Sequence, residues 1–417
     1  MIKIAKIAYR NLLRYSRRTL LTSMLVIIGI AAVLLFIAIA GSFKQLMVGQ
    51  ITDSMLGHLQ VHRKGYVASI DSSPLNLNLN PNQANKLREI LDNTDGIVAY
   101  SGRLKFGGML SSFTETSNIR LNGIDLAQEL KTAPLLKQRI SGSDTEKEAA
   151  TLKRGEIWVP ETLAKGMKLK VGTQIVLVTT NNDGSVNGVP LVVSGIAGAM
   201  TGPGGRDGYL HIEDAYQLLR VKAGEVNEFA IRLNQFDQLE QIFEKLKKQF
   251  ADIKNKKGKP VFEVHTWKKL SPFSNIAKII DLLTLFVKVI LIAIVLVSIM
   301  NVMLMAVYER IREIGTIAAI GTSPRKIWSL FLMEGLFIGF FGAVIGSLIS
   351  LGIIRFLNWK KLTIAFGRQD SLVLEPTIAL SEVLVTMSIV IVISALASLQ
   401  PAVKASKLEP VDALRHF

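Results

Sequence analysis

The chain has 417 residues, of which 49% are hydrophobic, and it contains no cysteine, which excludes disulfides and thiolate metal sites. Its apolar residues are concentrated in a few long blocks, which is typical of membrane proteins and not of soluble proteins. Basic residues outnumber acidic ones by 49 to 33, a net charge of +16. In a membrane protein this excess indicates cytoplasmic flanks and anionic lipid, and it argues against nucleic acid as a partner.

The first 18 residues carry six basic side chains and no acidic one. Five of the six are spaced by three or four positions and therefore share one face of a helix. The opposite face carries the apolar residues Ile4, Ile7, Ala8 and Leu12. We predict a cytoplasmic amphipathic N-terminal helix over residues 1–18, whose basic face meets lipid phosphates. A solvated basic terminus is the alternative, and it would orient the next span equally well.

An uncharged apolar run from Leu20 to Ala40 follows. At 1.5 Å per residue it covers roughly 30 Å, the thickness of the hydrocarbon core of a bilayer. It exceeds the ~7–15 apolar residues of a signal-peptide core, so we predict a retained anchor, transmembrane helix 1 with a stalk over residues 19–48. The preceding basic residues place the N-terminus in the cytoplasm.

Residues 49–270 change character, with short alternating apolar segments separated by Gly, Pro and Asn. We predict a mixed α+β domain, with two subdomains and a surface linker at Ser141–Lys153. Because one span precedes it, this domain is expected on the far side of the membrane. The predicted helices are Asn82–Leu91, Ile212–Leu219 and Gln238–Phe250. The predicted strands are His58–His62, Ile119–Leu121, Ile157–Val159, Ile175–Val178, Leu191–Val193 and Glu228–Leu233.

Three further apolar runs complete the chain. The fold class predicted is a membrane protein of four transmembrane α-helices, with a large α+β extracytoplasmic domain inserted between helices 1 and 2. Charges at Lys278, Asp281 and Lys288 indicate that the second span begins as a stalk outside the bilayer, to which the end of the first span can pair. The predicted order is stalk and transmembrane helix 2 over 271–307, a cytoplasmic helix over 308–325, helix 3 over 326–358, an external loop over 359–376, helix 4 over 377–401 and a cytoplasmic tail over 402–417.

The segment 308–325 lies between two spans and is amphipathic, which predicts a helix along the membrane surface. Gly321 follows its last apolar position, as a helix-terminating glycine does. Ser323 and Pro324 then form the N-cap and first-turn pair of the next helix. Such a segment is placed to receive a push from a soluble partner, although an ordinary interfacial loop helix would show the same pattern.

The third span contains one acidic residue and a series of glycines. Glu334 falls within one to two turns of the expected cytoplasmic end, where an acid costs less than the ~2.5–3.5 kcal/mol of the bilayer centre. Glycines recur every three or four residues and form a ridge on which another helix can pack closely. These helix-packing residues are Gly335, Gly339, Gly342 and Gly346.

Catalytic and cofactor motifs are not evident in the sequence. No GxxxxGK[ST] phosphate-binding loop occurs, and we interpret Gly202–Gly205 as a plain loop. His58 and His62 share a strand face without a third metal ligand, which favours a structural role. We therefore expect no enzyme activity, no metal and no cofactor bound by this chain.

The segment YERIREIGTIAAIGTSPRKIW at 308–328 resembles the coupling-helix region of FtsX-like ABC permeases. This group holds the MacB-like macrolide exporters and the LolC/LolE-like lipoprotein-releasing permeases. RGEIWVPETLAKGMKLKVGTQIVLV at 154–178 resembles the extracytoplasmic domain of the family, and PAVKASKLEPVDALRHF at 401–417 resembles its C-terminal tail. DGYLHIEDAYQLLR at 207–220 is similar to the lipoprotein-releasing branch in particular.

The resemblance implies a multi-pass protein of the bacterial inner membrane, with both termini cytoplasmic and the large domain periplasmic. It implies a dimer with a second four-helix permease subunit, identical or not, and a separate cytoplasmic ABC ATPase that binds ATP and Mg. The implied function is mechanotransmission, in which ATP hydrolysis drives the periplasmic domains to extract or export a lipoprotein or another amphiphile. The residues implied in ATPase coupling are Glu309, Arg310, Arg312, Glu313, Ile314, Gly315, Ala319 and Gly321.

Two alternatives within the resemblance stay open. One is a non-transporting FtsX-type regulator or signalling scaffold, and the other is MacB-like efflux of a drug or peptide. A periplasmic adaptor or a lipoprotein chaperone is a further possible partner. The LolC kind carries an extended hairpin for the chaperone, whereas here we expect only a short turn over Thr179–Pro190. This departure counts against chaperone docking by this subunit.

Overall fold

The computed structural model describes residues 2–14, 16–72, 74–141, 151–198, 207–366 and 369–409. The chain divides into two compact units. The first comprises Met1–Gln45, Lys278–Ile364 and Val373–Phe417, and the second comprises Leu46–Ala277 with Ala365–Leu372. The expected loop at Gly202–Gly205 lies outside the described residues, as do residues 142–150 of the expected linker and residues 410–417 of the expected tail.

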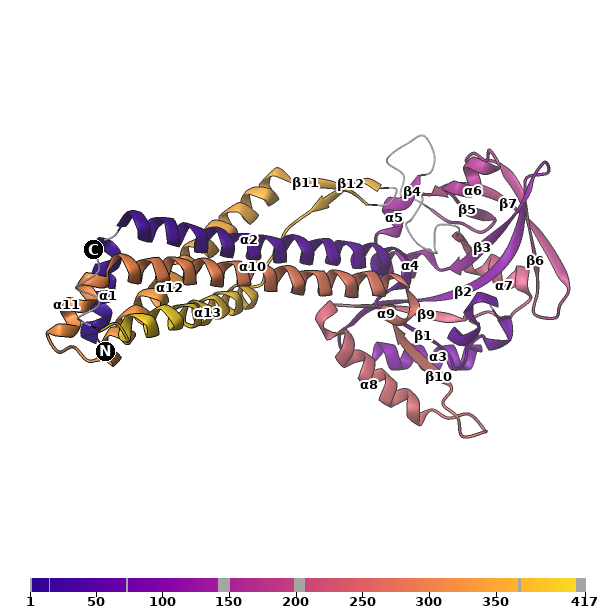
Figure 1. Ribbon diagram of the computed structural model, residues 1–417. Coiled ribbons are helices and arrows are strands. Elements are labelled where there is room, and N and C mark those ends of the chain that lie inside the picture. The colour runs from indigo at the N-terminus through magenta and orange to yellow at the C-terminus, as the bar shows by residue number, and fades with distance from the viewer. Residues whose placement is uncertain are drawn as a thin grey trace. The chain divides into compact units, whose positions relative to one another are not determined.

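The first unit is helical (Figure 1). Four segments are long and apolar enough to cross a membrane, namely Ser23–Leu56, Phe273–Glu309, Pro324–Lys360 and Leu380–Ser406, in agreement with the four spans predicted. At ~1.5 Å per residue, the 37-residue helices exceed a ~30 Å hydrocarbon core, so their ends project from it. The helices are α1 (Ile2–Arg14), α2 (Ser16–Ile51), α10 (Phe273–Glu309), α11 (Ile311–Ala319), α12 (Pro324–Lys360) and α13 (Leu380–Ser406).

The glycine ridge of α12 lies against two different helices. A Cβ atom added at Gly339 would lie 1.9 Å from Ser394 Oγ of α13, and one at Gly335 would lie 1.7 Å from Ser398 Oγ. One turn further along, a Cβ at Gly342 would lie 2.5 Å from Val26 of α2. Gly346 meets the same helix, with the carbonyl of Ile27 2.9 Å from such an atom. The helices therefore approach more closely than any side chain at these positions would permit.

Helices α2 and α10 run side by side (Figure 1), as predicted for the end of the first span and the stalk. Lys44 Nζ lies 2.6 Å from Asp281 Oδ1. Both side chains are substantially exposed, so this ion pair contributes at most about 1 kcal/mol to stability. It marks one point at which the two helices meet and contributes little to holding them together.

The segment predicted as an external loop over 359–376 contains a β-hairpin that was not predicted. Strand β11 (Leu362–Phe366) pairs with β12 (Gln369–Leu374). Lys361 takes a left-handed backbone conformation, with φ of 48°, and ends the helix before it. The sequence LTIAF that follows alternates between apolar and other residues, which suits a strand, although no strand was predicted there.

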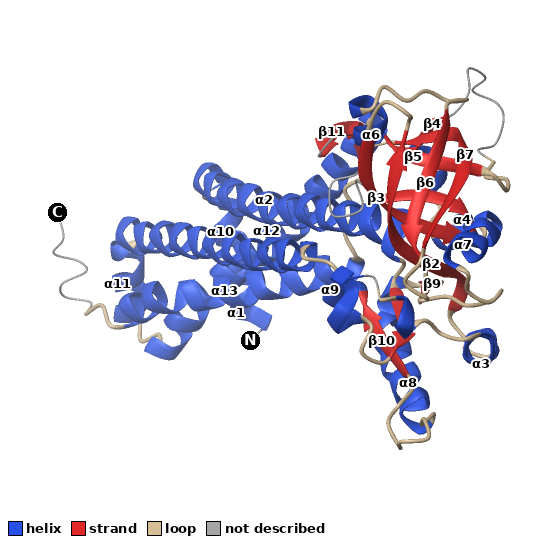
Figure 2. Cartoon of the chain, turned by 90° about the vertical axis from the view of Figure 1, so that its right-hand side faces the viewer, coloured by secondary structure: helices blue, strands red, loops and turns tan. Residues whose placement is uncertain are grey.

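The second unit is built on a ten-stranded sheet in the order β10-β1-β9-β2-β3-β8-β5-β7-β4, with β6 paired to β2 and β7 (Figure 2). Strand β2 (Ile97–Ser111) is long enough to serve both parts of the sheet. Its first half pairs with β9 and its second half pairs with β3 and β6. The other strands are β1 (Leu59–Arg63), β3 (Thr116–Ile124), β4 (Ile140–Ser141), β5 (Glu156–Pro160), β6 (Gln174–Thr180), β7 (Val186–Ala197), β8 (Asp207–His211), β9 (Glu228–Leu233) and β10 (Phe262–Thr266).

Short helices cover this sheet. Helix α3 begins with a capping box, in which the Asn80 side chain accepts from the Gln83 amide and the Gln83 side chain accepts from the Asn80 amide. A buried core of leucine, isoleucine and valine side chains from β2, β3, β5, β6, β7 and α7 fills one part of the unit. The helices are α3 (Pro81–Asp92), α4 (Leu126–Thr132), α5 (Leu136–Arg139), α6 (Glu161–Gly166), α7 (Ile212–Leu219), α8 (Leu239–Asp252) and α9 (Trp267–Leu270).

All three predicted helices and all six predicted strands of this unit are confirmed; α7 and β9 have the predicted bounds, and the ends of the others are shifted. Strands β2, β4, β8 and β10 were not predicted. The predicted turn over Thr179–Pro190 is too long. Strand β6 ends at Thr180 and β7 begins at Val186, so the turn comprises only Asn181–Ser185. Ladder pairing across the hairpin outweighs the turn-forming residues on its β7 arm.

The glycine packing predicts a selective effect of adding one methyl group. We expect Gly339→Ala to destabilise the protein by about 1–3 kcal/mol, because the new Cβ has no room beside Ser394. Gly41→Ala in α2, where nothing lies within 4 Å, is the matched control and should be neutral or stabilising. Thermal unfolding of the two variants in detergent makes the comparison. Equal unfolding temperatures would show that α12 and α13 do not pack as described.

Candidate coupling site

The site is built on a break between α10 and α11. Arg310 stands between them, with φ of −109° and ψ of 18°, outside the helical range. Its amide donates to the Val307 carbonyl at 3.2 Å and its carbonyl accepts from the Ile314 amide at 2.9 Å. The expected cytoplasmic helix over 308–325 is therefore shorter, because α10 takes Tyr308 and Glu309 and α11 covers Ile311–Ala319.

The end of α11 is fixed by glycine, as predicted. Gly321 has φ of +94°, a backbone conformation that few other residues adopt without strain. Its amide donates to the Ala318 carbonyl, and the Thr322 amide donates to the Ile317 carbonyl, the pair of bonds of a Schellman motif. Ser323 then precedes α12 and Pro324 opens it, although the Ser323 side chain makes no capping hydrogen bond.

The side chain of Arg310 holds this break against α12. Its Nη1 atom lies 3.0 Å from Glu334 Oε1, and its Nε atom lies 3.0 Å from Glu313 Oε2. Asn11 of α1 donates from Nδ2 to the same Glu334 Oε1 at 2.8 Å. The guanidinium also lies over the ring of Phe331, 5.7 Å from its centroid. One buried cluster thus connects α1, α11 and α12.

Burial of Arg310 and Glu334 makes their pairing important for stability. Arg310 is 8% exposed and Glu334 is 4% exposed, so neither charge is well hydrated. Removing one member of such a pair costs about 3–5 kcal/mol, because the other charge remains buried without its partner. The sequence predicted only that Glu334 lies near the cytoplasmic end of its span, and the structure adds the groups that pair with it. The acid is accommodated because Arg310 and Asn11 satisfy it.

The eight residues expected to contact the ATPase divide into two sets. Arg310, Ile314 and Gly315 are buried, and Ile314 belongs to the core of the helical unit. Glu313 is half-buried against Arg310. The outward set is Glu309, Arg312, Ala319 and Gly321. The surface that a partner can reach is thus about half of the predicted set.

Two exposed isoleucines belong to the same surface. Ile317 is 39% exposed and Ile320 is 81% exposed, although both repeat at the helical spacing that predicted one apolar face. That face is divided, since Ile314 packs inward while these two point out. An exposed isoleucine at the end of a short charged helix is suited to packing against another protein.

Further contacts hold the neighbouring helices. Lys404 of α13 hydrogen-bonds to the hydroxyl of Tyr308 in α10 and lies 4.6 Å from the centroid of its ring. In α1, Ala8 is buried, and the ring of Tyr9 lies 6.3 Å from that of Phe337 in α12. Ile7, which was expected on the same side as Ala8, is exposed. Helix α1 therefore packs on α12 through a narrower stripe than the sequence predicted.

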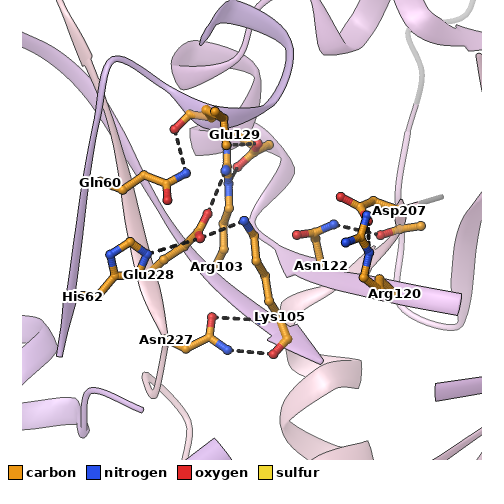
Figure 3. A network of polar contacts seen from close by, with 12 residues as sticks. Gln60, His62, Arg103, Lys105, Arg120, Asn122, Glu129, Asp207, Asn227 and Glu228 are labelled. Carbon is orange, nitrogen blue, oxygen red and sulfur yellow. Dashed lines mark hydrogen bonds and ion pairs between the residues drawn. The ribbon is translucent and has the colours of Figure 1, made fainter. Parts of the chain in front are cut away.

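A second buried charge cluster lies in the sheet unit and was not predicted (Figure 3). Arg103 of β2 lies 2.6 Å from Glu129 of α4 and 2.8 Å from Glu228 of β9, and all three are at most 2% exposed. Lys105 reaches the other oxygen of Glu228 at 2.7 Å. Two cations and two carboxylates balance, so this cluster ties β2, β9 and α4 together. The two-residue spacing of Arg103 and Lys105, which places them on one strand face, was the available indication.

The protonation states of this cluster follow from burial and charge. Burial alone would raise the pKa of Glu228, but Lys105 and Arg103 hold it well below its ordinary value. His62 lies 3.6 Å from Glu228, too far for a good hydrogen bond. Burial lowers the pKa of His62 and the charge of Glu228 only partly opposes this. His62 is therefore a neutral, buried side chain stacked on Tyr66.

The two histidines considered for a metal have separate partners. His58 accepts a hydrogen bond from the Leu233 amide through Nδ1, whereas His62 faces Glu228. Over the described ranges, no group of three or more His, Asp or Glu side chains is arranged to hold a metal ion. The contacts of both histidines fit the structural role expected of them.

Comparison with known proteins agrees with this architecture. Residues 19–249 match the family model of the MacB-like periplasmic core domain, and residues 285–410 match that of the FtsX-like permease C-terminal region. The chain belongs to the FtsX-like permeases of ABC transporters that carry a MacB-like periplasmic core domain. The resemblance stated from the sequence is confirmed.

Relatives differ in how much of them the chain matches. It is 38% identical over 136 residues to the ABC transporter permease YtrF of Bacillus subtilis, covering 31% of each chain. It is 25% identical to the lipoprotein-releasing system transmembrane protein LolC of Haemophilus influenzae, covering 66% of this chain and 69% of LolC. It is 24% identical to the macrolide export ATP-binding/permease protein MacB 1 of Yersinia pestis, covering 98% of this chain and 59% of that protein. The extracellular domain of the transporter YknZ, 12% identical, gives a TM-score of 0.33 and covers 50% of this chain and 99% of that domain, a likeness too weak to inform function.

The Arg310–Glu334 pair predicts a non-additive result. Glu334→Leu should destabilise the protein by up to about 3–5 kcal/mol, because the buried guanidinium loses its buried carboxylate and keeps only the partly exposed Glu313 as an ion-pair partner. The double variant Arg310→Met/Glu334→Leu should recover most of that loss, since no buried charge remains. Arg325→Gln, at an exposed position of α12, is the control. Thermal unfolding in detergent compares these three variants with the wild type; a double variant no more stable than Glu334→Leu would contradict the pairing.

His62 predicts how stability changes with pH. The pKa of His62 is lower in the folded chain than in the unfolded chain, so as the pH drops below ~6.5 the unfolded chain binds a proton that the folded chain does not. Stability should therefore fall in this pH range. His62→Gln should reduce this slope between pH 7 and 5.5, whereas His211→Asn, which can still cap α7, should keep it. Glu228 does not affect this comparison, because its lowered pKa contributes stability that is lost only below about pH 4.5. Denaturant unfolding across this pH range tests the account, and equal slopes in all three proteins would refute it.

Proposed function

We propose that this chain is the permease subunit of an ABC transporter that converts ATP hydrolysis by a separate cytoplasmic ATPase into motion of its periplasmic domain. The observation that carries the proposal is the construction of α11. Arg312 and Ala319 of α11 are exposed, as is Glu309 at the end of α10, whereas Arg310 joins the inner side of the segment to α12. A surface helix with one face exposed and the other joined to a span is suited to passing on a displacement.

The path of the displacement follows from the contacts. A push on α11 reaches α12 through the Arg310–Glu334 pair and reaches α1 through Asn11. It reaches α10 through the chain itself, because only Arg310 separates the two helices. Helix α10 is continuous from Glu309 to Phe273, and the sheet unit begins at its far end. We propose that α10 carries the motion to the periplasmic side, with no phosphate chemistry in this chain.

The membrane placement belongs to the same proposal. Both termini and α11 lie in the cytoplasm of a bacterium, and the unit that includes residues 49–270 lies in the periplasm. We propose the following segments along the chain: the amphipathic helix 1–18, the first span with its stalk 19–48, the periplasmic domain 49–270, the stalk and second span 271–307, the coupling segment 308–325, the third span 326–358, the external segment 359–376, the fourth span 377–401 and the cytoplasmic tail 402–417. A second permease subunit, identical or not, completes the assembly, and each subunit binds one ATPase.

For the cargo we propose a lipoprotein or a comparable amphiphile. LolC, which the chain matches over two thirds of both lengths, is named for lipoprotein release, and MacB is named for macrolide export. The β6–β7 hairpin ends in the short turn Asn181–Ser185, so we assign docking of a chaperone to the other subunit. An adaptor of the MacB kind is the partner expected if the cargo is instead a drug or peptide.

A regulator of cell-wall hydrolases is the second candidate. It would use the same coupling helix and differ in what the periplasmic unit does. The size of that unit, 232 residues between Leu46 and Ala277, favours the handling of cargo. Release of a fluorescent lipoprotein from reconstituted vesicles, with ATP and the copurified ATPase, separates the candidates, because a regulator would release none.

The coupling surface predicts the effect of a single charge reversal. Glu309→Lys should abolish copurification of ATPase activity with the permease, because it reverses the charge of the exposed surface of the coupling segment. Glu409→Lys makes the same change at another exposed position beyond α13 and should keep the association. ATPase activity in affinity-purified, monodisperse protein is the readout. Full activity retained with Glu309→Lys would remove this surface from the proposal.

A further inference from the structure

A groove lies at the end of α12 opposite to the coupling site. It has a volume of about 800 Å³, within the range of small-molecule sites. One side is formed by α12 between Leu351 and Trp359, and the other by Pro376, Thr377 and Ile378, which lead into α13. The Thr377 amide donates to Ser42 Oγ of α2 at 2.9 Å, which fixes the second side in place.

The groove lies at the boundary of the hydrocarbon core. Glu334 and Arg355 enclose 20 residues of α12 without a charge, a length of about 30 Å, which matches the core of a bilayer. With Glu334 at one boundary, Arg355 stands at the other, at the level of lipid phosphates. The lining residues Leu351 and Ile354 then face acyl chains, and Trp359 stands among headgroups, where tryptophan is enriched.

The polar groups of the groove have capacity left for a ligand. Within the described residues, no hydrogen bond or ion pair engages the guanidinium of Arg355. Asn358 donates from Nδ2 to the Pro376 carbonyl at 3.0 Å, but its Oδ1 atom is buried and has no partner among the described residues. Lys360 lies over the ring of Trp359, 5.2 Å from its centroid. The groove thus offers one cation, Arg355, and one unused acceptor above an apolar wall, and Lys360 is a second cation beside the lining residue Trp359.

We propose that this groove binds an anionic phospholipid of the outer leaflet whose headgroup carries hydroxyls, of the phosphatidylglycerol type. Arg355 binds the phosphate, with Lys360 adding positive charge at the rim. A headgroup hydroxyl donates to Asn358 Oδ1, which satisfies an acceptor that is otherwise buried at a cost. The acyl chains lie along Leu351 and Ile354.

The charge of this end of α12 supports an anionic occupant. Lys360 and Lys361 follow Arg355 at the end of a span where the positive-inside rule disfavours cations, and the nearby Glu375 is exposed and does not line the groove. A bound phosphate accounts for positive charge there. The inference rests on the membrane placement in the proposed function and does not depend on the ATPase or the cargo.

Native mass spectrometry of the whole detergent-purified chain, titrated with phosphatidylglycerol or phosphatidylcholine, tests the site. We expect phosphatidylglycerol to bind more tightly than phosphatidylcholine, and Arg355→Gln to weaken it by roughly tenfold, the loss of one charged hydrogen bond. Arg325→Gln, at the other end of α12, should bind as the wild type does. Inorganic phosphate should not compete, which separates a lipid from a free anion.

Three outcomes would overturn the proposal. One is equal affinity of the wild type and Arg355→Gln for phosphatidylglycerol, and another is competition by inorganic phosphate at the same concentration as lipid. The third is crosslinking of a Trp359→Cys variant to a second copy of the chain, which would make the groove a dimer contact. Copurified ATPase activity, measured on the same variants, should remain unchanged, so a failure here is distinct from a failure of the coupling proposal.

Discussion

The buried pair of Arg310 and Glu334 is the constraint on which the helical unit depends. A carboxylate inside an apolar span and a guanidinium at a helix break would each be costly alone, and together they satisfy one another. Because Asn11 joins the same carboxylate, the pair fixes three chain segments that are far apart in sequence. Removing it would leave α11 attached by its backbone and by the apolar contacts of Ile314.

This arrangement supports the coupling that we propose. A partner that moves α11 must move α12 with it, since separating them exposes two charges to a low-dielectric environment. The glycines of α12 extend the connection, because Gly335 and Gly339 hold α13 while Gly342 and Gly346 hold α2. In the sheet unit, the cluster around Arg103 plays a comparable part by tying β2, β9 and α4 together. We propose that both clusters make their units move as rigid bodies.

The sequence predicted those features that depend on local pattern. Long apolar runs identified the four candidate spans. Gly321 identified the end of α11, because few residues other than glycine adopt the positive φ that ends a helix in this way. Long-range pairing was beyond it. The residues around Glu334 in the sequence do not indicate that Arg310 and Asn11 are its partners. The apolar periodicity of α11 also did not predict that Ile314 is buried while Ile320 is exposed. Strand β2 was missed because its glycines and charges mask its alternation.

The central claim is that the coupling helix and the sheet unit lie on opposite sides of one membrane. The chain has no cysteine, so a single introduced thiol reports on its own position. In intact cells or spheroplasts, a membrane-impermeant maleimide should label a Thr114→Cys variant, at an exposed turn between β2 and β3, without permeabilisation. A Thr316→Cys variant, on the exposed face of α11, should be labelled only after the membrane is opened. Labelling of both thiols from the same side would contradict the account.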